Sequence, residues 1–436
     1  MAILIVLACA LQEVSPPTPP PEVAPEWLNL IHGTYRMQYR SRWTADDGDS
    51  DLFNFVSVTV GNPDKDLFSA AASGRFQSDL DGDGSHDGFS PFESLSDSYQ
   101  RATTAQLHYA YVDLNDPAAG VQVRAGRLIL DEMPEALPID GGRIAFEVSP
   151  GVTVAGFGGL PVNYFESSNE GDFTYGGWIE AHPWERGRAR LEYLHLEDEN
   201  TFGLFRDDLI GLTVEHVEGG CLFGGRATVL ESEARDILLR GSVSDAAAGL
   251  TVDVRAYYLF EQQQAHAYGL DAYVVVLVPV EPYYQLSVSA SKELSETFGL
   301  DASVTARQLE NGSDEAAYNH EFTRWSFTAR SSKWPTRDLS VALTGDFWQT
   351  QADDFWTAGA AVNWQIAEQV KGVVSSYYSL YSIDGLTGEE HERVRALTLA
   401  LRWKATDVLY ADVRFTVEEN DIDTFRIFDI GGRYAF

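Results

Sequence analysis

Cysteine, methionine and long apolar runs are scarce in this chain. Two of its 436 residues are cysteine and three are methionine. If an amino-terminal export signal is removed, Cys221 is the only cysteine left, so no intramolecular disulfide can form. Beyond residue 10, no segment reaches the roughly 18 to 20 consecutive apolar residues of a spanning helix, which excludes a helical membrane architecture.

Positive charge and catalytic motifs are also scarce. The sequence holds 31 Lys and Arg against 66 Asp and Glu, a formal net charge of -35, which disfavours nucleic-acid binding. It lacks a Cys-x-x-Cys-His motif for c-type haem. The histidines, including His108, His182, His195 and His266, lie in segments without a recognisable nucleophile motif. We therefore expect no enzyme and no cofactor, apart from the calcium ion considered below.

What the sequence does contain is regular alternation of apolar and polar positions. From Leu28 onward, segments of about ten to fourteen residues alternate and are separated by Gly, Asp, Asn and Pro clusters. In 250–260, for example, Leu250 and Val252 fall on one face and Asp253 on the other; 298–307, 339–347 and 397–404 alternate likewise. Soluble sandwiches also alternate, but their strands usually have only about five or six residues.

Counting these segments predicts an all-β fold, a transmembrane antiparallel up-and-down β-barrel over residues 27–436. We expect about 22 strands, within a range of 18 to 24, and no plug domain. The short junctions 62–65, 332–337, 367–368 and 405–406 then lie on the periplasmic side, while 79–97, 310–319 and 384–392 lie outside. At this strand number the lumen is too wide for side chains to close it.

The amino-terminus is typical of an exported protein. Residues 1–10 have a short apolar core and a small-x-small cleavage site at Ala8-Cys9-Ala10, although no Lys or Arg precedes the core. A second interpretation makes Cys9 a lipidated residue. Residues 11–26 form a proline-rich periplasmic linker. No globular plug of about a hundred residues precedes the first strand, which argues against an energy-coupled transporter.

The carboxy-terminus alternates strictly and ends on an aromatic residue. Phe428, Ile430, Tyr434 and Phe436 fall on one face, with Asp429 and Arg433 on the other. The ending, with Asp429, Gly431, Tyr434 and Phe436 at the matching positions, resembles the signal by which outer-membrane β-barrels are recognised for assembly. The resemblance implies an integral outer-membrane protein of a Gram-negative bacterium, with the barrel-assembly machinery, lipid and lipopolysaccharide as partners.

Acidic residues concentrate in turns such as 46–51 and 197–199. A negative field at a pore mouth attracts cations and repels anions, which predicts cation preference. The alternative is that acidic loops only keep the exterior solvated and bridge to lipopolysaccharide through divalent ions.

One loop resembles a calcium-binding loop. Residues 79–87 have the Asp-x-Asp-x-Asp-Gly spacing, with candidate ligands Asp79, Asp81, Asp83 and Asp87. Position twelve is Ser90, so the usual bidentate Glu is missing. The pattern predicts a structural calcium ion, and the alternative is a calcium-free Asp/Gly loop.

A stretch of about forty residues resembles alginate-export-type and related outer-membrane porins. It comprises Val123–Arg127, Ile139–Ile144 and Val152–Gly159, and Leu128 stands where that family tends to have Gln. The resemblance implies a lumen lined by a ladder of arginines and acids that selects solutes. By parity the counterparts are Arg127, Arg143, Arg188, Arg190, Arg255, Arg307, Arg324, Arg395 and Arg402, with Asp253 and Asp301.

Three functions compete on the sequence. The first, which we favour, is a passive channel for small hydrophilic solutes. The second is a barrel that sheathes a partner such as a multihaem cytochrome in an electron conduit. The third is a barrel enzyme, which needs a Ser/His or Asp/His pair at the rim. Residues 79–97 are the leading candidate for a loop that folds inward, and no pattern specifies an oligomeric state.

Overall fold

The computed structural model describes residues 30–63, 65–81, 103–131, 133, 136–162, 172–200, 203–260, 281–310, 321–350, 354–379, 381–383, 390–421 and 423–436. The expected signal peptide, the linker and Cys9 lie outside these ranges. Within them, no helix is both long enough and apolar enough to cross a membrane.

The extended elements follow one another along the chain with short breaks. They are β1 (Ile31–Trp43), β2 (Gly48–Val60), β3 (Phe68–Asp79), β4 (Thr103–Asp116), β5 (Val121–Leu130), β6 (Leu137–Ser149), β7 (Val152–Pro161), β8 (Phe173–Ala181), β9 (Gly187–Asn200), β10 (Gly203–Glu218), β11 (Cys221–Leu230), β12 (Glu233–Asp245), β13 (Leu250–Leu259), β14 (Tyr283–Glu293), β15 (Phe298–Leu309), β16 (Phe322–Ser332), β17 (Leu339–Thr350), β18 (Asp354–Ala367), β19 (Val370–Ser379), β20 (Tyr381–Ile383), β21 (Glu390–Glu392), β22 (Arg395–Lys404), β23 (Leu409–Glu419) and β24 (Thr424–Ala435).

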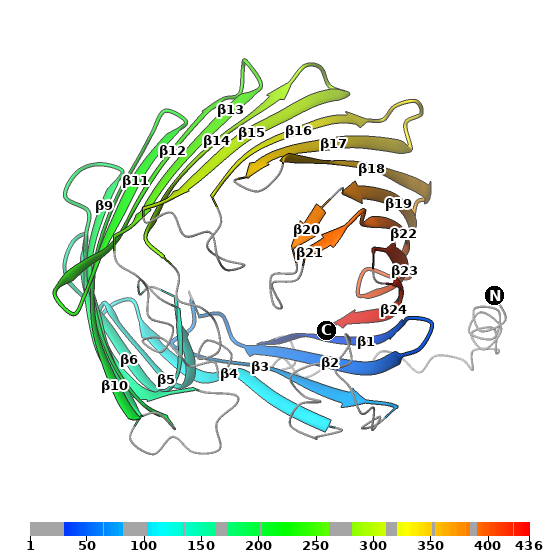
Figure 1. Cartoon of the computed structure of the whole chain (residues 1–436). Helices are drawn as coiled ribbons and strands as arrows, with labels where there is room; N and C mark the ends of the chain where they lie inside the picture. Colours follow the sequence, from blue (N-terminus) through cyan, green and yellow to red (C-terminus); the bar gives the residue numbers. More distant parts are fainter. Residues whose placement is uncertain are drawn as a thin grey trace, which may run out of the picture.

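In the described part of the chain, 22 of these strands form one antiparallel sheet, and β20 and β21 form a separate two-stranded sheet. Each strand of the large sheet pairs with the next in sequence, and β19 pairs with β22. The sheet closes because β1 pairs with β24, from Thr34 opposite Ala435 to Trp43 opposite Arg426 (Figure 1). The prediction of a closed all-β barrel with about 22 strands is therefore confirmed.

The connections differ between the two ends of the barrel. At the end where β1 begins and β24 ends, the longest connection between strands is 61–67. The opposite end carries the connections 80–102, 260–282, 310–321 and 380–394. This agrees with the predicted distribution of short turns on one side and long connections on the other.

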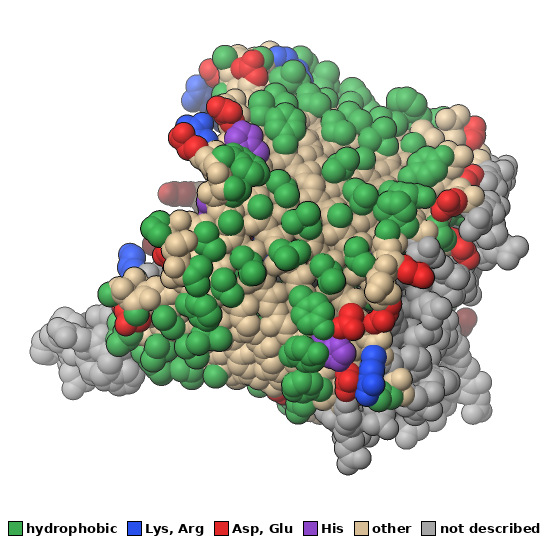
Figure 2. All heavy atoms as spheres, turned by 90° about the vertical axis from the view of Figure 1, so that its left-hand side faces the viewer, with side chains coloured by type: hydrophobic (Ala, Val, Ile, Leu, Met, Phe, Trp, Pro, Cys, Tyr) green, Lys and Arg blue, Asp and Glu red, His purple; other side chains and the backbone are tan. Residues whose placement is uncertain are grey.

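The outward face of the barrel is apolar. Residues that lie opposite each other on neighbouring strands share a face, so the register assigns every strand position to the inside or the outside. Leu191, Leu212 and Leu239 of β9, β10 and β12 are each about half exposed on the outside. Figure 2 shows that apolar side chains cover this wall, with acidic and basic side chains at its two edges. A strand of about ten residues, tilted by about 40°, spans the roughly 25 Å of such an apolar band.

The carboxy-terminal residues form the closing seam. The backbone of Phe436 exchanges two hydrogen bonds with Gly33, at 2.9 and 3.0 Å, and the ring of Tyr434 stacks on that of Phe436. Gly431 and Asp429 face inward from the same strand. The Asp429 carboxylate, 6% exposed, accepts hydrogen bonds from Arg40 Nε and Gln38 Nε2, both at 2.9 Å. The four residues predicted as an assembly signal thus lie where the first and last strands meet.

We expect Asp429→Ala to weaken this seam. The substitution leaves two inward donors without their acceptor, which costs about 1 to 2 kcal/mol of unfolding free energy because Arg40 is partly exposed. Urea unfolding in detergent, followed by tryptophan fluorescence, measures it. Asp407→Ala, at a carboxylate that is 94% exposed, is the control and should stay within about 0.5 kcal/mol. Equal effects of the two substitutions would show that the seam contact is not special.

Candidate functional site

The inward faces of the strands carry charged side chains from one side of the barrel to the other. The register places nine of the residues expected to line the pore on this face: Arg143 of β6, Arg188 and Arg190 of β9, Arg255 and Asp253 of β13, Asp301 and Arg307 of β15, Arg324 of β16 and Arg402 of β22. The charged face therefore encloses the lumen of a barrel whose outside is apolar.

Two of the predicted pore-lining residues lie outside instead. Arg127 is opposite Asp140 and Ala110 and shares the outward face of β5 with Val123, whereas Arg124, three residues earlier, points inward. The guanidinium of Arg127 binds both carboxylate oxygens of Asp140, at 2.7 and 2.6 Å. The prediction for Arg127, which came from the porin resemblance, was wrong because the inward positions of β5 are those of Arg124 and Gly126, and Arg127 has the opposite parity.

Arg395 is the second correction. It shares the outward face of β22 with Leu397 and Leu399 and lies opposite Tyr378. Its guanidinium lies 5.5 Å from the centre of the Tyr378 ring. Because Tyr378 itself faces outward, Arg395 belongs to the outer rim of the membrane-facing surface.

Sequence reasoning missed many inward arginines. They include Arg36, Arg40 and Arg42 of β1, Arg75 of β3, Arg124 of β5, Arg226 of β11, Arg240 of β12, Arg330 of β16, and Arg414 and Arg433 of β23 and β24. Strand parity could have found them, since most alternate with apolar neighbours. For Arg226 and Arg240, which lie between Phe202 and Glu296, the strand boundaries that parity requires were ambiguous.

Inward arginines are paired with acids on neighbouring strands. Arg190 donates to Glu180 Oε2 from Nε and Nη2, at 2.8 and 2.6 Å, and Glu215 is bound by both Arg188 and Arg240. On the far side of the lumen, Arg324 donates to Asp346 at 3.0 and 2.9 Å. Water-exposed ion pairs add little to stability. Their consequence is a wall of fixed, alternating charges.

The outer ends of β5 and β6 lean into the lumen. Gly126, Gly141 and Gly159 lie opposite one another on the inward face of β5, β6 and β7. Gly126 has a φ of +130, and a Cβ there would lie 2.2 Å from the carbonyl oxygen of Ala110; at Gly141 it would lie 2.2 Å from that of Gly158. Only glycine permits such close backbone approach, so this row marks where the sheet can bend.

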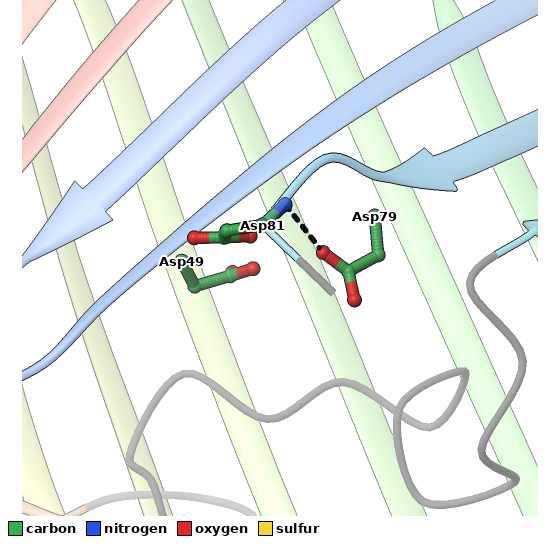
Figure 3. A group of neighbouring side chains, drawn as sticks. All are labelled: Asp49, Asp79 and Asp81. Carbon is green, nitrogen blue, oxygen red and sulfur yellow. Dashed lines mark hydrogen bonds between the residues drawn. The ribbon is translucent and has the colours of Figure 1, made fainter. Parts of the chain in front are cut away.

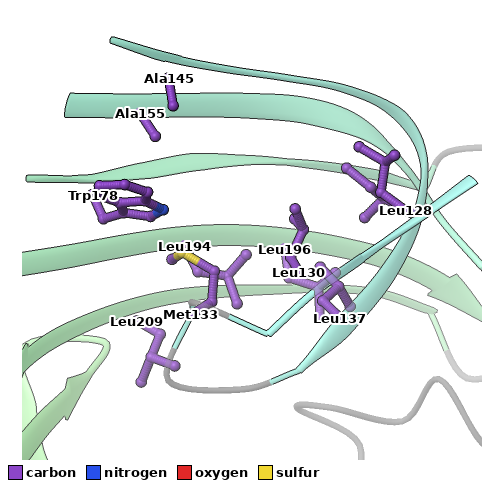
Figure 4. Close-up of a cluster of buried hydrophobic side chains, with 11 residues drawn as sticks. Leu128, Leu130, Met133, Leu137, Ala145, Ala155, Trp178, Leu194, Leu196 and Leu209 are labelled. Atoms are coloured by element: carbon purple, nitrogen blue, oxygen red, sulfur yellow. The ribbon is translucent and has the colours of Figure 1, made fainter. Parts of the chain in front are cut away.

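Beyond the glycine row an apolar cluster joins strands that are not neighbours in the barrel. Leu128 and Leu130 of β5, and Leu137 and Ile139 of β6, pack with Leu194 and Leu196 of β9 and Leu209 of β10, each at most 3% exposed. Figure 4 shows Leu196 beside Leu130, and Met133 beside Leu194 and Leu209. β7 and β8, which lie between β6 and β9 in the sheet, add Ala155 and Trp178 to the same cluster, so the outer ends of β5 and β6 fold over the inner face of this wall. We call the described residues 128–131, 133 and 136–139 the inward hairpin end.

The inward hairpin end packs on the inner face of the wall and takes up part of the lumen, and β20 and β21 also lie within the ring of strands in Figure 1. The sequence pointed instead to residues 79–97, of which 82–97 lie outside the described ranges. Between the inward hairpin end and the wall of β9–β12 lies a cavity of 280 Å³, lined by Asp131 and Met133 on one side and by charged side chains of the wall on the other.

The predicted calcium ligands meet a third acid. Oxygens of Asp79, Asp81 and Asp49 lie within 4.8 Å of one another at the outer ends of β2 and β3 (Figure 3). Asp81 accepts a hydrogen bond from the Ser50 amide at 3.1 Å. Partial desolvation, and the nearby carboxylates of Asp79 and Asp49, raise the pKa of the Asp81 carboxyl. Asp83 and Asp87 lie outside the described residues, and Asp49 was missed because it is thirty residues away in sequence.

An Asp/His pair does occur at the outer rim. His195 Nδ1 lies 2.8 Å from Asp208 Oδ1, and Nε2 lies 3.4 Å from Glu197. Both strands present these groups outward, beside Tyr175, whose ring centroid is 4.7 Å from that of His195. Both ring nitrogens of His195 face carboxylates, while the Tyr193 hydroxyl donates to the same Asp208 oxygen at 2.6 Å and the Thr174 hydroxyl donates to the His195 carbonyl oxygen at 2.8 Å.

Comparison with known proteins supports the fold alone. No protein-family model matches the chain, and no curated protein matches it. The P pilus usher (PapC) translocation pore superposes with a TM-score of 0.53 and 7% identity, covering 93% of this chain and 99% of that one. OccAB3 of Acinetobacter baumannii gives a TM-score of 0.45 at 8% identity and the same coverage. OpdK of Pseudomonas aeruginosa, solved with vanillate, gives 0.41 at 10% identity, covering 93% and 98%.

These values establish a likeness between this barrel and that of the usher pore. The resemblance to alginate-export-type porins finds no support among these matches and stays a prediction.

We expect Leu209→Ala to release the inward hairpin end from the wall. Leu209 is fully buried in the apolar cluster, and truncating such a side chain costs about 2 to 5 kcal/mol of packing free energy. Hydrogen exchange followed by mass spectrometry should show faster exchange in peptides from 128–139. Leu212→Ala, on the outward face of the same strand and 48% exposed, should leave those peptides unchanged. Slow exchange in both variants would contradict the role of the cluster.

Proposed function

We propose that this protein is an outer-membrane porin, a passive channel for small hydrophilic solutes. The observation that carries the proposal is the closed barrel of 22 strands among the described residues, apolar outside and charged inside. A closed barrel satisfies every backbone hydrogen bond in lipid, and one of this width encloses water unless something fills it. The protein is integral to the outer membrane of a Gram-negative bacterium.

The selectivity of the channel follows from where its excess negative charge lies. Along the wall, arginines and acids are paired across strands and largely compensate one another. The net charge of -35 therefore resides in turns and connections such as Asp46 and Asp47 between β1 and β2. Acids at the outer mouth raise the local concentration of cations. The proposed channel prefers cations for this reason.

The remaining partners follow from the two ends of the barrel. The outer acidic connections are suited to lipopolysaccharide, whose phosphates they meet through divalent ions. The seam formed by Asp429, Gly431, Tyr434 and Phe436 ends on an aromatic carboxy-terminus, which favours recognition by the barrel-assembly machinery. Both assignments belong to the same proposal of an outer-membrane barrel.

Calcium has a structural role in the proposal. Asp49, Asp79 and Asp81 supply oxygen ligands of the kind that calcium prefers, and they come from the outer ends of two strands. A bound ion would screen three carboxylates that otherwise repel one another. It would hold the β1–β2 turn against the end of β3.

Conductance of single channels in a planar bilayer tests the channel function. The purified protein should give stable steps, and a salt gradient should produce a cation-selective reversal potential. Asp46→Asn combined with Asp47→Asn should move that potential toward zero. Asp407→Asn is the control, because its charge is already paired with Lys404 at 2.6 Å at the opposite end. An inserted barrel without conductance would contradict the channel and favour the sheath.

Thermal unfolding with and without calcium tests the acidic cluster. Millimolar calcium should raise the unfolding temperature of the native protein by linkage, and less so at lower pH, where protons compete for Asp81. The triple variant Asp49→Asn, Asp79→Asn and Asp81→Asn should lose the shift. Asp46→Asn, in the same turn but outside the cluster, should keep it. A shift that survives in the triple variant would rule out these ligands.

A further inference from the structure

Five basic side chains gather on the inward face of the barrel beside the closing seam, at the end where β1 begins. They come from β1, β19, β22 and β24: Arg36, Lys371, Arg402, Lys404 and Arg433. The register places Arg433 opposite Arg36 across the seam, and Arg402 opposite Lys371. We call these five residues the seam-side basic patch.

The charge of this patch is not compensated as it is elsewhere on the wall. Arg36, Arg402 and Arg433 are exposed, and no ion pair joins any of them to an acid among the described residues. On the inward face itself the patch contains one acid, Asp412, opposite Arg402. The adjoining turns contribute two further acids, Asp407 and Glu368. A surplus of positive charge therefore faces the lumen at this mouth.

An exposed aromatic ring lies inside the patch. Tyr410 of β23 faces inward, is 40% exposed, and lies between Lys404 of β22 and Arg433 of β24 in the register. Proline-rich segments bind surfaces of this kind, because their rings pack on aromatic side chains and their extended conformation is set in advance. Guanidinium groups bind carboxylates. The ligand chemistry that combines the two is an acidic, proline-rich stretch of polypeptide.

This chain carries such a stretch directly before β1. Residues 11–26 contain six prolines and three glutamates, and no Lys or Arg. Glu22 lies eight residues before Leu30, whose carbonyl accepts a hydrogen bond from the Gly61 amide at this end of the barrel. Eight residues in the extended polyproline conformation span about 25 Å, whereas Arg36 lies only about 20 Å along the chain from Leu30. The segment is therefore long enough to turn back into the mouth.

We propose that residues 11–26 bind the seam-side basic patch and form a tethered plug in this mouth of the barrel. Glu22 and Glu26 face the guanidinium groups of the patch, and the prolines pack on Tyr410. The bound segment narrows the mouth and cancels the positive charge of the patch. Its effect on permeation rests on the proposed channel function, but its binding can be measured without any transport.

Fluorescence anisotropy of a dye on the segment measures the binding. Thr18→Cys in a Cys221→Ser background gives one attachment point in the full-length protein purified without its signal peptide. A bound segment restricts the dye, so the anisotropy should be high at about 0.1 M salt. It should fall at about 1 M salt, because the Debye length shortens from about 10 Å to about 3 Å. Anisotropy that is independent of salt overturns the inference.

Two matched variants and a control locate the contact. Glu22→Gln with Glu26→Gln, and Arg402→Gln with Arg433→Gln, should each reduce the salt-sensitive part of the anisotropy by at least about half. The control, Arg255→Gln with Arg324→Gln, removes the same charge from inward positions of β13 and β16 and should leave the anisotropy unchanged. Heat-dependent migration on gels verifies that each variant is folded.

Two patterns in these variants contradict the plug. If the control lowers the anisotropy as much as the patch variant does, the attraction is a general effect of the lumen charge. If neither matched variant lowers it, the patch serves another occupant, such as an acidic segment of a partner protein or a dissolved anion. Either result overturns the inference.

The result is distinguishable from that of the channel test. A protein that conducts in bilayers but shows no salt-sensitive anisotropy keeps its proposed function and loses the plug. A protein whose segment binds the patch but that does not conduct keeps the plug contact and loses the channel.

Discussion

The backbone hydrogen bond is the interaction on which this structure depends. In lipid, an unpaired N–H or C=O group costs several kcal/mol, so both edges of every strand must be paired. The pairing of β1 with β24 meets that requirement, and it makes the two faces of the sheet unequal. One face becomes the surface toward lipid and the other becomes the wall of a water-filled space. The apolar residues on the outside and the arginines on the inside follow from this division.

The inward hairpin end departs from the division for a local reason. At the end of β5, Leu128 and Leu130 occupy the face that elsewhere carries Arg124 and other charges. Their burial against Leu194 and Leu209 is possible because the glycine row lets the strand ends bend inward over the adjacent wall, β7 to β10. These leucines are therefore shielded from water although they lie on the inward face of the barrel. It also encloses a space beside the charged wall, where Glu192 is buried.

How much could be predicted from the sequence differed between the fold and the site. Alternation in segments such as 397–404 was enough to predict strands, their length and a closed barrel. Successive side chains of a barrel strand face lipid and lumen in turn, so apolar and polar residues alternate along the sequence. The inward placement of Arg402 followed from the same alternation. Placing Arg127 and Arg395 correctly also requires knowing where their strands begin and which face of each strand points outward. The contact of Leu128 with Leu194, and that of Asp49 with Asp79, depends on tertiary geometry. Local sequence carries no signal for either.

The seam has a consequence for how the molecule is made. Arg40 and Asp429 touch across a separation of 389 residues, so the contact that closes the cylinder is among the most remote in the chain. Contacts of such high sequence separation form late and slowly. Until then, the first and last strands each present an unpaired edge, the feature that drives sheets to associate with other chains. A nascent chain of this protein must therefore be escorted to its membrane in an open form, and its two ends are the parts most in need of protection during that interval.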